Sequence, residues 1–134
     1  MIRTLMEEIQ AQLKSELEHE RVYIGVPKQT AGKSPELYIY PVGYLAVPVK
    51  IRQSDATYTI AVVVEQTVVN ETALIGFWEY MDDVYDYFTR LGDHYILTTD
   101  GDYIVLSINA RYYNTPTSDI AQTEIMIDVK LFNQ

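Results

Sequence analysis

The sequence predicts an α+β domain in which a mostly antiparallel sheet packs against two amphipathic helices. Apolar residues recur at three- and four-residue spacing in two segments and alternate every second residue in several others. Neither helical segment belongs to a repeated strand-helix-strand series, which argues against a parallel sheet. The Asp100-Gly101 pair joins two strand-like runs as a hairpin. We expect the order α-β-β-β-β-α-β-β-β in one domain, residues 1–134.

The first helix is expected over residues 2–18, with charged residues opposite one apolar stripe. The stripe consists of Ile2, Leu5, Met6, Ile9, Leu13 and Leu17. A short strand follows in RVYIGV, residues 21–26, where Val22, Ile24 and Val26 alternate with other residues.

Two extended pieces are expected next, ELYIYPVGY and LAVPVKI. They are interrupted by Pro41, Gly43 and Pro48, which favour a sheet edge or a bend because proline lacks a ladder donor. Residues 57–69 (TYTIAVVVEQTVV) then form the most apolar strand. Both faces of this strand are mostly apolar, so it should lie centrally or be covered on both sides.

The second helix is expected over residues 73–91, with Asn70 or Thr72 as its cap and Gly92 as its stop. Its predicted inward stripe is Leu74, Phe77, Trp78, Met81, Val84, Tyr85, Phe88 and Leu91. The length of this stripe predicts that the helix packs on the sheet.

The last three strands comprise the Asp100-Gly101 hairpin and a closing amphipathic strand, QTEIMIDVKLF. One face of the second hairpin arm is predicted to hold Ile104, Leu106, Ile108, Ala110 and Tyr112. Tyr103, Val105 and Tyr113 are assigned to the opposite face, which then also requires cover. In the closing strand we expect Ile125, Ile127, Val129 and Leu131 to point inward.

The composition and charge of the chain exclude or disfavour several classes of protein. The chain has no cysteine, which excludes disulfides, thiolate metal sites and a cysteine nucleophile. No stretch is typical of a signal peptide or a membrane helix, so we expect a soluble, non-secreted protein. The net charge of −9 disfavours general nucleic-acid binding. Residues 21–54 are nevertheless basic, with five bases and one acid, which suits head-to-tail contact between identical subunits.

Gly32-Lys33-Ser34 matches the end of a phosphate-binding loop, but its context does not. Pro27 replaces the first glycine, where the chemistry needs backbone N–H groups, and Pro35 favours an extended chain where a helix should begin. We therefore expect no bound nucleotide.

Other motifs give no support for catalysis or metal binding. The carboxylates of Glu79, Asp82, Asp83 and Asp86 share one helix face, but a straight helix cannot surround an ion, so solvent or a channel is the expected environment. His19 and His94 each lack a second ligand nearby in the sequence. No serine lies in a nucleophile motif. We expect no enzyme activity, no cofactor and no metal.

Twelve tyrosines are present, and tyrosine supplies rigid contact area with a polar tip. Ordinary half-buried strand positions account for most of them. Tyr103 and Tyr113 are candidates for contact with a neighbouring subunit.

The order of elements resembles the tail-terminator (tail-completion) proteins of long-tailed bacteriophages. The resemblance rests on an opening helix (IRTLMEEIQAQLKSEL), a strand feeding a helix (TYTIAVVVEQTVV to TALIGFWEYMDDVYDYFTRLG), then a hairpin and a closing strand (TEIMIDVKLF). The connection YPVGYLAVPVKIRQ has no counterpart in that pattern.

The resemblance implies a non-enzymatic virion protein, assembled in the host cytoplasm, that forms a homohexameric ring. Such a ring caps the tail tube and joins it to the head connector, while DNA passes through it without specific binding. Charge placement makes Lys28, Lys33, Lys50 and Arg52 candidate contacts with a subunit or partner. The acidic residues 79–86 are then candidates for the channel surface. Two alternatives stay open: a monomeric or dimeric protein-binding adaptor, and a small-ligand-binding domain.

Overall fold

The computed structural model describes residues 2–18, 21–26, 32, 34–50, 53–91, 96–98, 102–114 and 119–132. Its elements follow the chain in the order α1 (Ile2–Glu16), β1 (Val22–Ile24), β2 (Glu36–Lys50), β3 (Gln53–Thr67), α2 (Glu71–Leu91), β4 (Ile96–Leu97), β5 (Asp102–Asn114) and β6 (Ile120–Phe132). The predicted α+β class is confirmed. The strands form one six-stranded sheet in the order β1-β2-β3-β6-β5-β4, and every neighbouring pair is antiparallel except β1 and β2.

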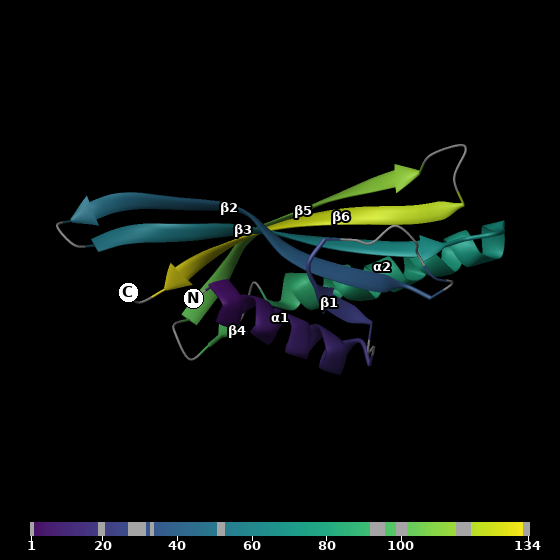
Figure 1. The fold of residues 1–134 in the computed structure, drawn as a ribbon, viewed down its shortest axis with the longest axis horizontal. Coiled ribbons are helices and arrows are strands. Elements are labelled where there is room, and N and C mark those ends of the chain that lie inside the picture. The colour runs from purple at the N-terminus through teal and green to yellow at the C-terminus, as the bar shows by residue number, and fades with distance from the viewer. Residues whose placement is uncertain are drawn as a thin grey trace.

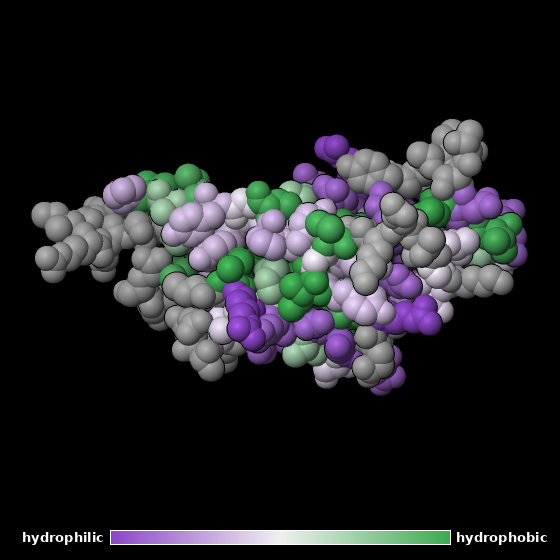
Figure 2. Space-filling model, viewed as in Figure 1, coloured by the Kyte–Doolittle hydropathy of each residue, from purple (hydrophilic) through white to green (hydrophobic). Residues whose placement is uncertain are grey.

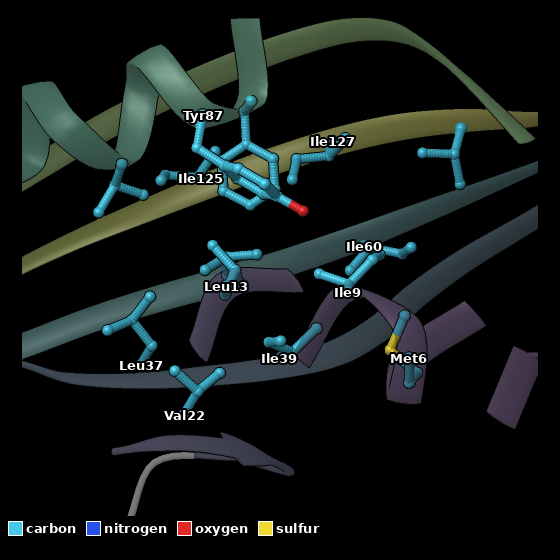
Figure 3. Packing of buried hydrophobic residues seen from close by; sticks show 14 of the residues in the cluster. Met6, Ile9, Leu13, Val22, Leu37, Ile39, Ile60, Tyr87, Ile125 and Ile127 are labelled. Atoms are coloured by element: carbon cyan, nitrogen blue, oxygen red, sulfur yellow. The ribbon is translucent and has the colours of Figure 1, made fainter. Parts of the chain in front are cut away.

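Both helices pack on the same face of the sheet (Figure 1). Side chains from α1 and α2 bury the apolar face formed by β2, β3 and β6, and Figure 3 shows Met6, Ile9 and Leu13 of α1 against this face. The predicted inward stripe of β6 is buried at all four positions. Side-chain hydrogen bonds also hold the helices: Tyr87 Oη of α2 donates to Gln12 Oε1 of α1 at 2.6 Å, and Gln10 Nε2 of α1 donates to the Val22 carbonyl of β1 at 2.8 Å.

β3 lies centrally, as its two apolar faces predict. Ile60, Val62 and Val64 face the helices and are fully buried. Ala61 and Val63 point to the sheet face without helices and are nevertheless buried. Their cover comes from larger neighbours in the sheet, because Val63 is flanked by Tyr38 of β2 and Glu124 of β6.

β2 differs from the prediction because its two expected pieces form one continuous strand. Register shifts between Pro41 and Gly43 and between Pro48 and Lys50 absorb the prolines without ending the strand. β1 pairs only with Leu37 to Ile39, so the prolines lie on an unpaired edge, as expected for a residue without an N–H.

β5 contains a bulge that overturns the predicted faces. Val105 pairs with Val129 and Ser107 with Asp128, which leaves Leu106 as an extra, 52% exposed residue. Beyond the bulge the register places Ile108, Ala110 and Tyr112 opposite residues of the buried β6 stripe and its continuation. They therefore share the helix side with Tyr103 and Val105. The bulge inverts the alternation because one added residue shifts the side-chain period of two.

α2 begins two residues earlier than predicted. Asn70 is its cap, since the Ala73 N–H donates to Asn70 Oδ1 at 2.8 Å. Phe77, Met81, Val84 and Phe88 are buried as expected. Trp78 is not: it is 41% exposed, because the helix presents Phe77 to the sheet at this turn and its sequence neighbour points about 100° away.

Candidate interaction surface

The sheet face away from the helices, here called the open face, is polar and aromatic. It is built by alternate residues of β2, β3, β6 and β5, which the ladder register aligns across the sheet. Its members include Glu36, Tyr38, Tyr40, Thr59, Ala61, Val63, Glu65, Gln122, Glu124, Met126, Asp128, Asn109 and Arg111. Such a mixture suits protein contact.

Tyr38 anchors one end of the open face. Its hydroxyl donates to Glu36 Oε2 at 2.7 Å, and its ring lies 5.5 Å from that of Tyr23 on β1. Burial, reinforced by the hydrogen bond to the Glu36 carboxylate, raises the pKa of Tyr38 to about 12. The phenol therefore stays neutral and remains a donor over the ordinary pH range.

Glu65 is a buried carboxyl group on the same face, only 8% exposed. Gln122 Nε2 donates to Glu65 Oε1 at 2.7 Å. Burial raises the pKa of Glu65; the Gln122 hydrogen bond opposes this rise and the Glu36 charge adds to it. Arg21 lies 3.6 Å from Glu36 and neutralises part of this acidic corner.

Asp128 joins three strands at the opposite end of the open face. Its two oxygens accept from Thr59 Oγ1 at 2.6 Å and Ser107 Oγ at 2.9 Å. Ser107 is the residue that follows the bulged Leu106, so this carboxylate holds the bulge against β6. These hydrogen bonds fix the side-chain positions of Thr59, Ser107 and Asp128.

The distal part of β2, residues 41–50, together with residues 53–56 of β3, is here called the arm. β6 pairs with β3 only from Thr57 onward, so the outer part of the arm, residues 46–50 and 53–56, is two-stranded and projects past the sheet at one end of the molecule's long axis (Figure 1). The exposed apolar residues of the arm are Val42, Tyr44, Leu45 and Val47, between 47% and 62% exposed. The Tyr44 ring packs 4.8 Å from Tyr58, which stiffens the base of the arm.

The outward side of α2 carries a second exposed cluster, here called the α2 patch: Ile75, Trp78, Glu79 and Asp82. Positions 75, 78, 79 and 82 share one side of a helix, and all four residues are exposed. In Figure 2 hydrophobic residues are visible on the arm at the left, and polar residues surround a hydrophobic group at the far right, where α2 begins. The arm and the α2 patch thus lie toward opposite ends of the molecule's long axis.

The predicted acidic stripe splits between two environments. Glu79 and Asp82 belong to the α2 patch, whereas Asp83 and Asp86 line an open groove between α2 and the end of α1. Arg90 crosses this groove to Glu16, with 3.1 Å between Nη2 and Oε2. Within the described ranges no group of three His, Asp or Glu side chains is arranged to hold a metal ion.

The predicted contact residues have different outcomes. Lys28, Lys33 and Arg52 lie outside the described residues, as do His19 and His94. Lys50 ends β2 on the arm, where it pairs with Gln53. The register places Tyr113 opposite Gln122.

Tyr103 requires a correction. It is fully buried under the helices, and its ring lies 6.1 Å from that of Tyr58. A buried side chain offers no surface to a second subunit, so the prediction of a subunit contact is wrong for this residue. The chain's own core covers the β5 face at Tyr103, whereas Ala110 and Tyr112 farther along the same face are exposed.

The arm is the feature that sequence reasoning missed. Its signal was present in residues 41–48, where apolar residues and two prolines follow one another without alternation. A core strand of such composition would be covered on both sides, whereas an arm that leaves the sheet exposes both. The segment after Ser34 is a strand and not a helix, as the analysis of the Gly32 loop predicted.

No helix in the described part of the chain is both long and apolar enough to cross a bilayer. No protein-family model matches the sequence, and no curated protein matches it significantly. The fold, however, is similar to a chain in the solved virion of a native gene transfer agent (GTA) particle. The two share 13% sequence identity with a TM-score of 0.56, and the match covers 96% of this chain and 92% of the other.

Proposed function

We propose that this chain is a non-enzymatic structural subunit of a phage-like virion, a tail-terminator-like protein that forms a ring between tail tube and head connector. The observation that carries the proposal is the fold similarity to a chain of a GTA virion over nearly the whole length of both proteins. The tail-terminator resemblance of the sequence adds the position within the particle.

The surface supports assembly more than catalysis. A subunit of a multi-protein particle needs exposed contact area on several sides, and a catalytic site needs a concave, water-excluding pocket. This chain has an open sheet face, an apolar arm and an acidic helix surface. The groove between the helices is open to solvent on one side, and its lining includes an ion pair within the chain, between Arg90 and Glu16.

The charge distribution suits a ring around DNA. Residues 71–91 contain five acids and one base. All four residues of the predicted acidic stripe are exposed: Glu79, Asp82, Asp83 and Asp86. Acidic groups repel phosphates, so those that line a channel would let DNA pass without binding it. Lys28, Lys33, Lys50 and Arg52, in the basic segment, are proposed to contact a neighbouring subunit or a tail protein.

Two measurements test this proposal. Light scattering coupled to size exclusion should give a ring mass, six times the 15.4 kDa of one chain, and electron microscopy should show rings. Immunogold labelling of particles should place the protein at the head–tail junction. A strictly monomeric protein, or label along the tail or absent from particles, would refute the role.

A further inference from the structure

We propose that the arm of one copy docks on the α2 patch of a second copy, so that successive copies join head to tail. This inference rests on the proposed function in one respect, namely that the chain assembles with itself. It adds the two surfaces that meet.

The first argument is the exposure of the arm. Leu45 is 62% exposed and Tyr44 59%, on a stretch of β2 whose outer edge pairs with none of the described strands. Apolar side chains grouped in this way indicate a contact surface, since scattered single residues are normal and clusters are not. An isolated two-stranded ribbon is also marginally stable alone, so a docking partner would stabilise it.

The second argument is the character of the α2 patch. Ile75 and Trp78 are 42% and 41% exposed, and tryptophan is among the residues most enriched at interface centres. Glu79 and Asp82 border them. An apolar centre with an acidic border matches an apolar arm whose sequence, residues 41–56, carries two bases, Lys50 and Arg52, and one acid, Asp55.

Charge also favours this patch over the exposed apolar residues around β1, Tyr23, Ile24 and Val26. The charge of the neighbouring Arg21 is balanced there by Glu36, 3.6 Å away. Glu79 and Asp82 of the α2 patch have no such partner among the described residues and would attract the bases in the arm sequence. Complementary charges of this kind fix register and partner choice.

The third argument is geometric. The arm projects at one end of the long axis and α2 begins at the other end, so a chain cannot dock its own arm on its own patch (Figure 1). A contact between two different surfaces of identical chains is heterologous, and its repetition gives a closed ring or an open filament.

The test uses two variants that each destroy one side of the contact. Leu45→Glu places a carboxylate on the arm, and Trp78→Glu places one in the α2 patch. Each residue is exposed, so both variants should keep the fold, which circular dichroism and thermal melting check. Each variant alone should be monomeric. An equimolar mixture should form one-to-one dimers, because the intact arm of the Trp78→Glu chain meets the intact patch of the Leu45→Glu chain.

The matched control is Leu106→Glu, which makes the same change at a 52% exposed leucine of β5. It should assemble as the unchanged chain does. The inference is overturned if Leu45→Glu still assembles, if the mixture stays monomeric, or if Leu106→Glu is equally disruptive. If the unchanged chain still self-assembles in any of these cases, the proposed function as a ring subunit stands. A monomeric unchanged chain at high micromolar concentration overturns both.

Discussion

Glu36 and Glu65 lie directly opposite each other on β2 and β3, so two carboxylates share one rung of the ladder at the open face. Like charges in this position destabilise a sheet. Two donors limit the effect, the Tyr38 hydroxyl on Glu36 and the Gln122 amide on Glu65. The arrangement makes the stability of the fold depend on pH at this site.

Glu65→Gln should stabilise the chain at pH 7. Burial raises the pKa of Glu65, so its ionised form opposes folding above the folded pKa, and this cost disappears below the unfolded value of 4.5. The glutamine keeps an acceptor for Gln122. Urea unfolding should therefore show a gain at pH 7 that vanishes below pH 4.5, whereas Glu79→Gln on exposed α2 should show no comparable gain. An equal gain at both pH values would contradict the assignment.

Tyr87→Phe should destabilise the contact between the helices. The buried hydroxyl donates to Gln12 across 75 residues of sequence, and loss of such a bond costs about 0.5–1.5 kcal/mol. Tyr44→Phe, at an exposed tyrosine of the arm, should change the unfolding free energy by less than about 0.5 kcal/mol. Denaturant unfolding compares the two, and equal effects would refute the role of the Tyr87 hydroxyl.

Phe77→Ala and Trp78→Ala should differ widely although the residues are adjacent. Phe77 is 1% exposed and Trp78 is 41% exposed. Removing a buried phenylalanine costs about 3–5 kcal/mol, whereas the tryptophan change should cost under about 1 kcal/mol in the isolated chain. Comparing the unfolding free energies of the two variants tests which side of α2 faces the sheet. A larger loss of stability for Trp78→Ala would show that α2 is rotated about its axis so that Trp78 faces the sheet.

Asn70→Ala should destabilise α2 by about 1 kcal/mol, because it removes the acceptor for the Ala73 N–H. Thr72→Ala is the matched control, since Thr72 lies inside the first turn and is exposed. Thermal melting of both variants decides between these two residues. A greater loss for Thr72→Ala would transfer the cap to that residue.

Local patterns predicted most of the fold. The β6 alternation, the two apolar faces of β3 and the cap before α2 each involve neighbouring residues, so sequence spacing carries the information. The predicted pairing of the strands around Asp100-Gly101 also agrees, since β4 pairs antiparallel with β5, while the turn residues lie outside the described ones. These elements account for the confirmed α+β class.

The failures share a different physical origin. Leu106 bulges because Asp128 and the β6 register hold Ser107, and this contact lies 21 residues away in sequence. Trp78 is exposed because packing selects Phe77, and an apolar stripe of that width fits either rotation. The arm escaped prediction because its projection past the sheet depends on where β6 stops pairing with β3. Each outcome is set by tertiary contacts that spacing does not encode.

The position of β6 between β3 and β5 bears on how the chain folds during synthesis. β6 is translated after all the other strands, yet it is the element that joins the β1-β2-β3 part to the β5-β4 part. Until it leaves the ribosome, the inner edges of both parts lack a partner. The sheet can therefore close only late, in a slow step that depends on contacts distant in sequence. Unpaired strand edges can pair with another chain, so nascent copies are most prone to associate before β6 is in place.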